Sequence, residues 1–335
     1  MENNIELHLK DKLTDDELKN INLLVMECFK DTPPIAMNTL TLDILNKSFS
    51  FEKKTILFYE KKSLVGGIFF SIVNNKFVSL PHFSCSELFY QKGYKDILYK
   101  KIFNYLTSNN LDYEIRSFDK LSKYYSDQKV ISYLELQDTV DNQMGFFKSK
   151  LRSQIKKGSK NNLTIEISGL SYLDKFYKIY SKNMHRLGSP VLSKVFFKNI
   201  LEAYDNNAYV FIVNYNNIVI GGSIVLSNGK LNEVCWASTS SEYNYLSTNM
   251  FLYWEMIKHA VNNNMKIFSF GRSTKDSSTL KFKKQWGVEQ KQLYWNVKNE
   301  PTIEIKKMTY LQELWKYIPL SIANFIGPIV SKRIY

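Results

Sequence analysis

The sequence has 335 residues, 44% of them hydrophobic and 15% aromatic, which is enough for about two folded domains and excludes an intrinsically disordered chain. Its 45 basic and 32 acidic residues leave a net charge of +13, which favours an anionic partner; a genome rich in A and T would explain the same excess. The three cysteines lie far apart, so no disulfide framework is predicted. The four histidines do not have the spacing of metal ligands, so no metal site is predicted. The N-terminal residues are too polar for a signal peptide, which predicts a cytoplasmic protein.

The first half of the chain predicts three consecutive strands, a helix and a closing strand. These elements are expected at residues 54–59, 64–73, 76–80, 94–108 and 112–116. The second half repeats this order, with Asn228-Gly229 as a hairpin turn. Its elements are expected at residues 207–215, 218–227, 230–238, 248–263 and 266–270. Each second strand carries a glycine pair (Gly66-Gly67 or Gly221-Gly222), and each closing strand leads to an arginine (Arg116 or Arg272).

Three antiparallel strands followed by a helix and a further strand are the core order of the N-acetyltransferase-like fold. We therefore predict an α/β (α+β) chain of two tandem N-acetyltransferase-like domains with mixed, largely antiparallel sheets. The predicted domains are residues 1–140 and 141–300, with the active site in the second, followed by a C-terminal extension over 301–335. This fold usually holds coenzyme A on a glycine-containing loop before the helix. Segment 242–248 contains no glycine, so an ordinary acetyl-coenzyme A site is not expected there.

Residues 148–160 contain six basic residues and no acidic residue. Helical spacing places Lys148, Arg152 and Lys156 on one stripe, and Lys157 follows them. Like charges four residues apart repel each other unless an anion lies between them, so we predict that this helix contacts phosphates. The alternative is a helix face that is simply solvated.

Residues 268–287 combine a strand end, a hydroxyl-rich loop and a lysine among aromatic residues. Arg272, just past the predicted strand end, suits bidentate phosphate binding, with Ser273 and Thr274 as further donors. Lys283 suits stabilisation of the negative charge that forms on a carbonyl oxygen in acyl transfer, an effect worth about 3–4 kcal/mol. We therefore predict a phosphate-bearing substrate beside an acyl carbonyl. A solvated basic loop is the alternative.

Several segments resemble the Fem family, the peptidoglycan bridge-forming aminoacyl transferases built from two acetyltransferase-like domains. These segments are KLRSQIKKGSKNNL (150–163), YKIYSKNMHRLGSPV (177–191), CWASTSSEY (235–243) and FGRSTKDSSTLKFKKQWG (270–287). The tail LWKYIPLSIANFIGPIVSKRIY (314–335) is similar to the branch of Fem-like proteins encoded with exosortase (PEP-CTERM)-associated exopolysaccharide systems.

The resemblance implies acyl or aminoacyl transfer to an amine or hydroxyl of a cell-envelope glycan precursor, in exopolysaccharide or peptidoglycan biosynthesis. It implies acyl-CoA or aminoacyl-tRNA as co-substrate, and no metal. The family's Phe-Lys before the final Trp/Phe-Gly is associated with the active site, and here it is Phe282-Lys283. The predicted catalytic residues are Lys283 and Arg272. The predicted substrate-binding residues are Arg152, Lys156, Lys157, Trp236, Tyr243, Ser273, Thr274, Phe282, Gln285 and Trp286.

Other roles stay open at this stage. Trp236 and Tyr243 are expected to stack on a sugar or close the pocket, with core packing as the alternative for Trp236. No general base is assigned; the candidates are His185, Glu242, Glu255 and Asp276.

The chain departs from the Fem-like branch at Ser269, where an Asp usually precedes Phe-Gly-Arg, and at segment 81–87, where a Pro-Phe-x-x-Tyr-Gly-Gly-like run is usual. Ser269 makes a catalytically inactive scaffold of an envelope-polysaccharide complex one alternative function. A nucleic-acid (tRNA)-binding protein that uses the basic surface is the other.

The tail contains an apolar run, residues 317–330, that is shorter than the roughly 20 residues needed to span a bilayer. Trp315, Lys316, Lys332 and Arg333 flank it. Segment 314–335 is expected either to lie at the inner-membrane surface near a lipid-linked precursor or to pack on the first domain.

Overall fold

In the computed structural model, which describes residues 4–300 and 305–334, the two halves repeat one order of elements over a longer stretch than the sequence predicts. Each half has a strand, two helices, three strands, a helix and two further strands. The first half comprises β1 (Ile5–Lys10), α1 (Asp15–Cys28), α2 (Leu40–Phe49), β2 (Glu52–Glu60), β3 (Ser63–Val73), β4 (Lys76–Val78), β5 (Phe89–Tyr90, a short extra strand), α3 (Lys95–Ser108), β6 (Asp112–Ser117) and β7 (Tyr124–Glu135).

Two helices, α4 (Val140–Phe146) and α5 (Ser149–Ser159), connect the halves. The second half comprises β8 (Thr164–Ser168), α6 (Leu173–Arg186), α7 (Lys194–Tyr204), β9 (Ala208–Tyr215), β10 (Ile218–Asn228), β11 (Leu231–Thr239), α8 (Thr248–Asn262), β12 (Ile267–Thr274), α9 (Ser278–Lys284) and β13 (Glu289–Val297). Short 3₁₀ helices lie at Ile35–Met37, Leu170–Tyr172, Asp205–Asn207 and Ser241–Leu246. The predicted Asn228-Gly229 hairpin turn is confirmed between β10 and β11, with Gly229 at φ +58°.

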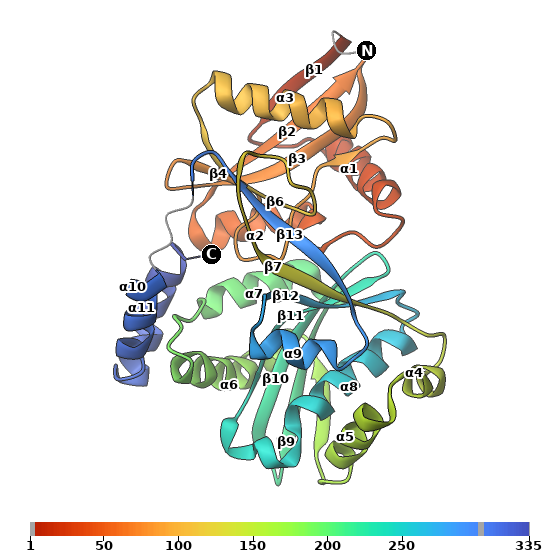
Figure 1. Cartoon of the computed structure of the whole chain (residues 1–335), viewed down its shortest axis with the longest axis vertical. Coiled ribbons are helices and arrows are strands. Elements are labelled where there is room, and N and C mark those ends of the chain that lie inside the picture. Colours follow the sequence, from red (N-terminus) through yellow and green to blue (C-terminus); the bar gives the residue numbers. More distant parts are fainter. Residues whose placement is uncertain (1–3, 301–304, 335) are drawn as a thin grey trace.

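The two halves exchange their last strands, so the described strands form one continuous sheet (Figure 1). The strand order is β1-β2-β3-β4-β6-β13-β7-β12-β11-β10-β9-β8, with β5 paired to β3. Strand β13 of the second half pairs with β6 of the first, and β7 of the first half pairs with β12 of the second. The predicted boundary between residues 140 and 141 therefore separates the chain halves but not the two parts of the sheet. Among the strand pairs of residues 4–300, only β4–β6 and β11–β12 are parallel.

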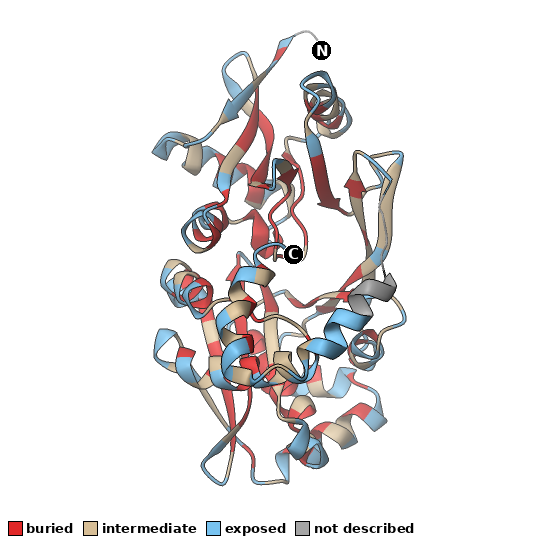
Figure 2. Ribbon diagram, turned by 90° about the vertical axis from the view of Figure 1, so that its left-hand side faces the viewer, coloured by how far each residue is buried: buried red, intermediate tan, exposed pale blue. Residues whose placement is uncertain are grey.

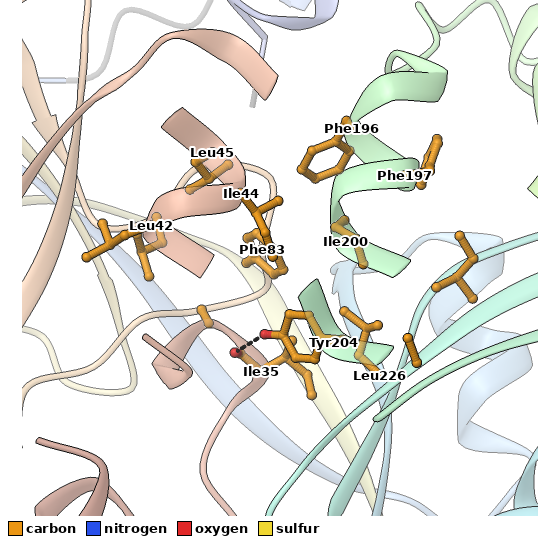
Figure 3. Close-up of a cluster of buried hydrophobic side chains, with 14 of the residues drawn as sticks. Ile35, Leu42, Ile44, Leu45, Phe83, Phe196, Phe197, Ile200, Tyr204 and Leu226 are labelled. Atoms are coloured by element: carbon orange, nitrogen blue, oxygen red, sulfur yellow. Dashed lines mark hydrogen bonds between the residues drawn. The ribbon is translucent and has the colours of Figure 1, made fainter. Parts of the chain in front are cut away.

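The largest hydrophobic core is shared by both halves. Helix α2 of the first half packs against α7 of the second, and Figure 3 shows their apolar side chains facing one another. At the centre, the buried Tyr204 hydroxyl donates a hydrogen bond to the Ile35 carbonyl (3.1 Å). Buried residues concentrate in the strands and on the inner helix faces (Figure 2). This shared core, together with the strand exchange, fixes the two halves to each other.

The second closing strand continues beyond its predicted end at Phe270. It runs to Thr274 because Gly271 adopts φ +67° and forms a bulge opposite β7, where the register shifts between Ser269 and Arg272. Glycine reaches this left-handed conformation without steric cost. Arg272 thus belongs to the strand and is not the start of a loop.

The tail forms two helices, α10 (Ile305–Trp315) and α11 (Leu320–Ser331). Helix α11 packs on α6 of the second half instead of on the first domain, and Gln312 of α10 lies against Gly188, just after α6. The first half is touched by Lys332, whose ammonium lies 5.8 Å from the Phe51 ring centre. Residues 301–304 of the predicted extension lie outside the described residues. In the described part of the chain, no helix combines the length and the apolar character that a membrane crossing demands.

Candidate active site

A polar pocket of about 300 Å³ opens where the parallel strands β11 and β12 separate. Their pairing covers Leu231–Glu233 and Ile267–Ser269 and then stops. The pocket walls come from residues 233–237, residues 270–272, and residues 82–84 of the first half. The remaining lining residues are Tyr253, Thr279 and Lys283. Both halves of the chain therefore contribute to one site.

Glu233 places a buried carboxylate at the point where the strands part. Its two oxygens accept hydrogen bonds from the hydroxyls of Ser84 (2.7 Å) and Ser269 (2.8 Å). Burial raises the pKa of Glu233, against the opposing effects of these serines and of the charges on Lys283 and Arg272. Ser269, where the Fem-like branch usually has an Asp, thus holds another carboxylate in place.

Lys283 is only 4% exposed, although the two other lysines of its short helix are not buried. The Ser277 hydroxyl starts α9 by accepting a hydrogen bond from the Leu280 amide (3.1 Å), which turns Lys283 inward. Its ammonium donates to the carbonyls of Gly271 and Arg272, both at 3.1 Å. Burial lowers the pKa of Lys283 to about 8, so near neutral pH it can hold or release a proton.

Arg272 reaches from the bulge of β12 across to the first half. Its Nη1 donates to the Phe83 carbonyl (2.9 Å), and its guanidinium lies 5.6 Å from the Trp295 ring centre. Burial and the charge of Arg116 lower the pKa of Arg272, but a guanidinium still carries its charge at neutral pH. On the same wall, burial with the charges of Arg116 and Arg272 lowers the pKa of His82 to about 3, so this imidazole is neutral.

The equivalent position in the first half is closed. Arg116 is fully buried and ion-paired to Glu114 through Nε (2.8 Å) and Nη2 (2.7 Å). The Trp295 ring lies over its guanidinium at 4.3 Å. The two closing-strand arginines therefore differ: Arg116 belongs to the core, and Arg272 lines a pocket.

Three of the predicted residues meet in the pocket: Lys283, Arg272 and Trp236. Trp236 also packs edge-on against Phe196 and Phe197, so it has the core contacts proposed as its alternative as well as a pocket face.

The structure places other predicted residues elsewhere. Trp286 is fully buried, with its ring against Phe147 and Phe282, behind the wall of a groove that it shares with Gln285. Ser273 is buried beside β7, and the Thr274 hydroxyl accepts a hydrogen bond from Lys129 (2.6 Å).

Tyr243 lines a separate hollow of about 240 Å³ with Asn183 and Arg186. The base candidates also lie outside the active-site pocket. Glu242 and Asp276 are exposed, Glu255 pairs with Lys258, and the His185 ring donates to the Ile318 carbonyl (2.7 Å).

Sequence reasoning missed Glu233 because the predicted strand over 230–238 gave no reason to single out one position. A signal was present: Glu233 is the only charged residue in Leu231–Thr239. A single charge in an otherwise uncharged strand suggests a buried and partnered group.

The basic helix α5 forms the edge of two open grooves. Arg152, Lys156 and Lys157 line the larger one, of about 850 Å³. Gln285 lines the other, of about 640 Å³, with Lys148 and Lys150. No salt bridge to these cations occurs among the described residues, which leaves their charges available to an anion.

The first turn of α8 does not fit a coenzyme A pyrophosphate. Helix α5 covers it, since a Cβ on Gly158 would lie 3.1 Å from the Phe251 Cβ, and Asn161 donates to the Leu246 carbonyl (2.8 Å). Backbone amides with open access, which a pyrophosphate requires, are therefore not presented there.

The repeated unit, the parallel strands that separate and the polar pocket between them define a tandem GNAT-like protein. Residues 145–284 match the family described as acetyltransferase (GNAT) domain. No curated protein sequence matches the chain.

Solved structures resemble the chain over most of its length. A crystal structure of FemX aligns with a TM-score of 0.65 at 14% identity, covering 88% of this chain and 98% of that one. The C-terminal domain (DUF2156) of a putative lysylphosphatidylglycerol synthetase from Agrobacterium fabrum gives 0.56 at 11% identity, covering 89% and 95%. A tandem GNAT protein from the clavulanic acid biosynthesis pathway gives 0.53 at 7% identity, covering 89% and 100%. At these identities the likeness is one of fold, and it confirms the predicted fold class.

Proposed function

We propose that the protein is an acyl or aminoacyl transferase that acts on an amine or hydroxyl of a cell-envelope glycan precursor. The observation that carries the proposal is Glu233, a buried carboxylate facing Lys283 and Arg272 in a pocket shared by both halves. A carboxyl group with a raised pKa beside two cations is a typical arrangement for general acid–base chemistry.

In this reaction the nucleophile's nitrogen or oxygen attacks the acyl carbonyl and its proton passes to Glu233. The new bond to the carbonyl carbon forms, the bond to the donor's leaving group breaks, and the proton returns to that leaving group. Arg272 and Lys283 stabilise the negative charge on the carbonyl oxygen, a contribution of about 3–4 kcal/mol for one well-placed donor.

The donor is an acyl or aminoacyl ester or thioester, and the cations of α5 are the proposed contacts for its phosphates. The start of α8 does not supply them. An envelope precursor as acceptor rests on the Fem-like motifs, including those of the exosortase-associated branch. A structural neighbour named for the synthesis of lysylphosphatidylglycerol supports a lipid-linked acceptor.

The test supplies the purified full chain with acyl-coenzyme A or charged tRNA, together with an envelope extract as acceptor. We expect turnover with one donor class and a loss on the order of 100-fold in Glu233→Gln, because the amide cannot accept the proton. Glu255→Gln is the matched control, since Glu255 is also buried but pairs with Lys258 outside the pocket (2.7 Å).

Wild-type turnover in Glu233→Gln would refute the catalytic role. An absence of turnover with every donor, in a protein that still binds the envelope precursor, would favour the inactive scaffold.

A further inference from the structure

The last helix, α11, buries small residues and exposes large apolar ones, which is the reverse of an ordinary surface helix. Its buried side consists of small residues, Ala323, Gly327 and Ser331, spaced four apart. Its large apolar residues, Ile322, Phe325 and Ile329, point outward, and Phe325 is 77% exposed. A surface helix normally buries its large apolar side chains and exposes polar ones.

The exposed apolar surface extends onto α10 and the turn that follows it. Tyr310, Leu311, Leu314 and Tyr317 are all exposed, the last at 84%. Together with α11, residues 310–334 hold eight of the 18 exposed large hydrophobic side chains in the described chain, so exposed apolar surface is concentrated in the tail. Patches of this kind mark surfaces that bind a partner or a membrane.

The inner contacts hold the patch outward. A Cβ on Gly327 would lie 2.8 Å from the Val191 side chain, so α11 sits as close to the second half as glycine permits. The His185 ring fixes the turn between the helices through the Ile318 carbonyl (2.7 Å). The large side chains therefore cannot turn inward without breaking this packing.

We infer that α10 and α11 form a membrane-surface anchor that inserts the exposed apolar face into a bilayer with anionic headgroups. Charge complementarity points to this occupant: residues 305–334 contain five basic residues and one acidic residue, Glu313, which pairs with Lys316. Lys332 and Arg333 are exposed beside the apolar face. With 12 residues, α11 is about 18 Å long, whereas a bilayer core is about 30 Å thick, so the helix lies in the interface.

The same charges disfavour a second copy as the occupant. A two-fold contact through this face would bring the cations of both chains together, because each partner presents the same patch. An anionic lipid surface neutralises them. The anchor requires nothing of the pocket chemistry, so its failure and that of the transferase proposal can be told apart.

The experiment sediments the full chain with vesicles of phosphatidylcholine alone and of phosphatidylcholine mixed equally with phosphatidylglycerol. We expect binding to the mixed vesicles and a loss on the order of 100-fold when Ile322, Phe325 and Ile329 are all changed to serine. Changing Lys332 and Arg333 to glutamate should weaken binding to the mixed vesicles about tenfold or more and leave the phosphatidylcholine result unchanged. The matched control converts three exposed apolar residues outside the tail to serine: Leu9, Leu23 and Ile218.

A Phe325→Trp variant gives an independent readout. Lipids brominated along the chain should quench its added fluorescence, since the side chain would lie among the acyl groups. Failure of the wild type to bind either vesicle overturns the inference. The inference is also overturned if the triple-serine variant binds vesicles as well as the wild type does. That result would assign the vesicle affinity to another basic surface, such as α5. Concentration-dependent dimers that the triple variant abolishes, without vesicle binding, would assign the face to a second copy.

Discussion

Replacing Lys283 by methionine should abolish transfer and at the same time leave the fold at least as stable as before. The ammonium is buried, which lowers the pKa of Lys283 from 10.5 to about 8. A shift of this size means that the folded protein disfavours the charged lysine by about 3 kcal/mol at neutral pH. Methionine removes this cost but leaves the carbonyls of Gly271 and Arg272 without their donor, a loss of about 1 kcal/mol each. We therefore expect the free energy of unfolding of Lys283→Met to exceed that of the wild type by about 1 kcal/mol at neutral pH.

The pH dependence isolates the electrostatic part of this effect. Between a folded pKa of about 8 and an unfolded pKa of 10.5, the unfolded chain binds more protons at Lys283 than the folded chain does. The stability that the wild type loses through Lys283 is therefore recovered as the pH rises through this window. Relative to Lys283→Met, the free energy of unfolding of the wild type should rise by about 2 kcal/mol between about pH 7 and about pH 9.5.

Urea unfolding of both proteins at the two pH values measures this difference, and the transfer assay measures turnover. Methionine itself does not titrate, so the change of this difference between the two pH values reports the titration of Lys283 alone. A stability difference that does not change with pH would show that Lys283 is not a desolvated ammonium. Turnover that is retained in Lys283→Met would show that Lys283 is not a catalytic residue.

Two further predictions concern the basic helix α5 and the two closing-strand arginines. Changing Arg152 and Lys156 together to alanine should weaken substrate binding about tenfold and reduce its salt dependence; an unchanged salt slope would mean that α5 is only solvated. The matched control pair consists of the exposed Lys19 and Lys47. Arg272→Ala should lower turnover on the order of 100-fold with a folded protein. Arg116→Ala should instead cost roughly 2–3 kcal/mol of stability, as thermal unfolding would show, because the buried Glu114 carboxylate keeps only its second cation, Lys76 (3.3 Å). Equal losses of activity in Arg272→Ala and Arg116→Ala, with both proteins folded, would show that assigning the active site to the second half is wrong.

The repeated core was predictable from the sequence because alternation, turns and glycine pairs are local signals. The predicted hairpin at Asn228-Gly229 and the helix from Thr248 have the boundaries expected, since both depend on neighbouring residues. The strand exchange was not predictable, because nothing local to Tyr294 indicates that it pairs with Ser117.

The candidate site was predictable only in part for the same reason. Lys283 and Arg272 were found from their own segment. Their partners, Glu233 and Ser84, reach the pocket from other strands and from the other half, and only the folded chain brings them together. The burial of Trp286 was not predictable, because a tryptophan beside a lysine has the same pattern whether it faces a ligand or the core.

The exchanged strands also determine when each half can finish folding during synthesis. In the described chain, β6 lies beside β13, whose residues Glu289–Val297 leave the ribosome long after those of β6. Until then the first half carries an open sheet edge, which is a template for pairing with other chains. Slower translation of residues 118–288 should therefore lengthen the period in which the nascent chain can aggregate, and a chaperone that covers the β6 edge should protect it.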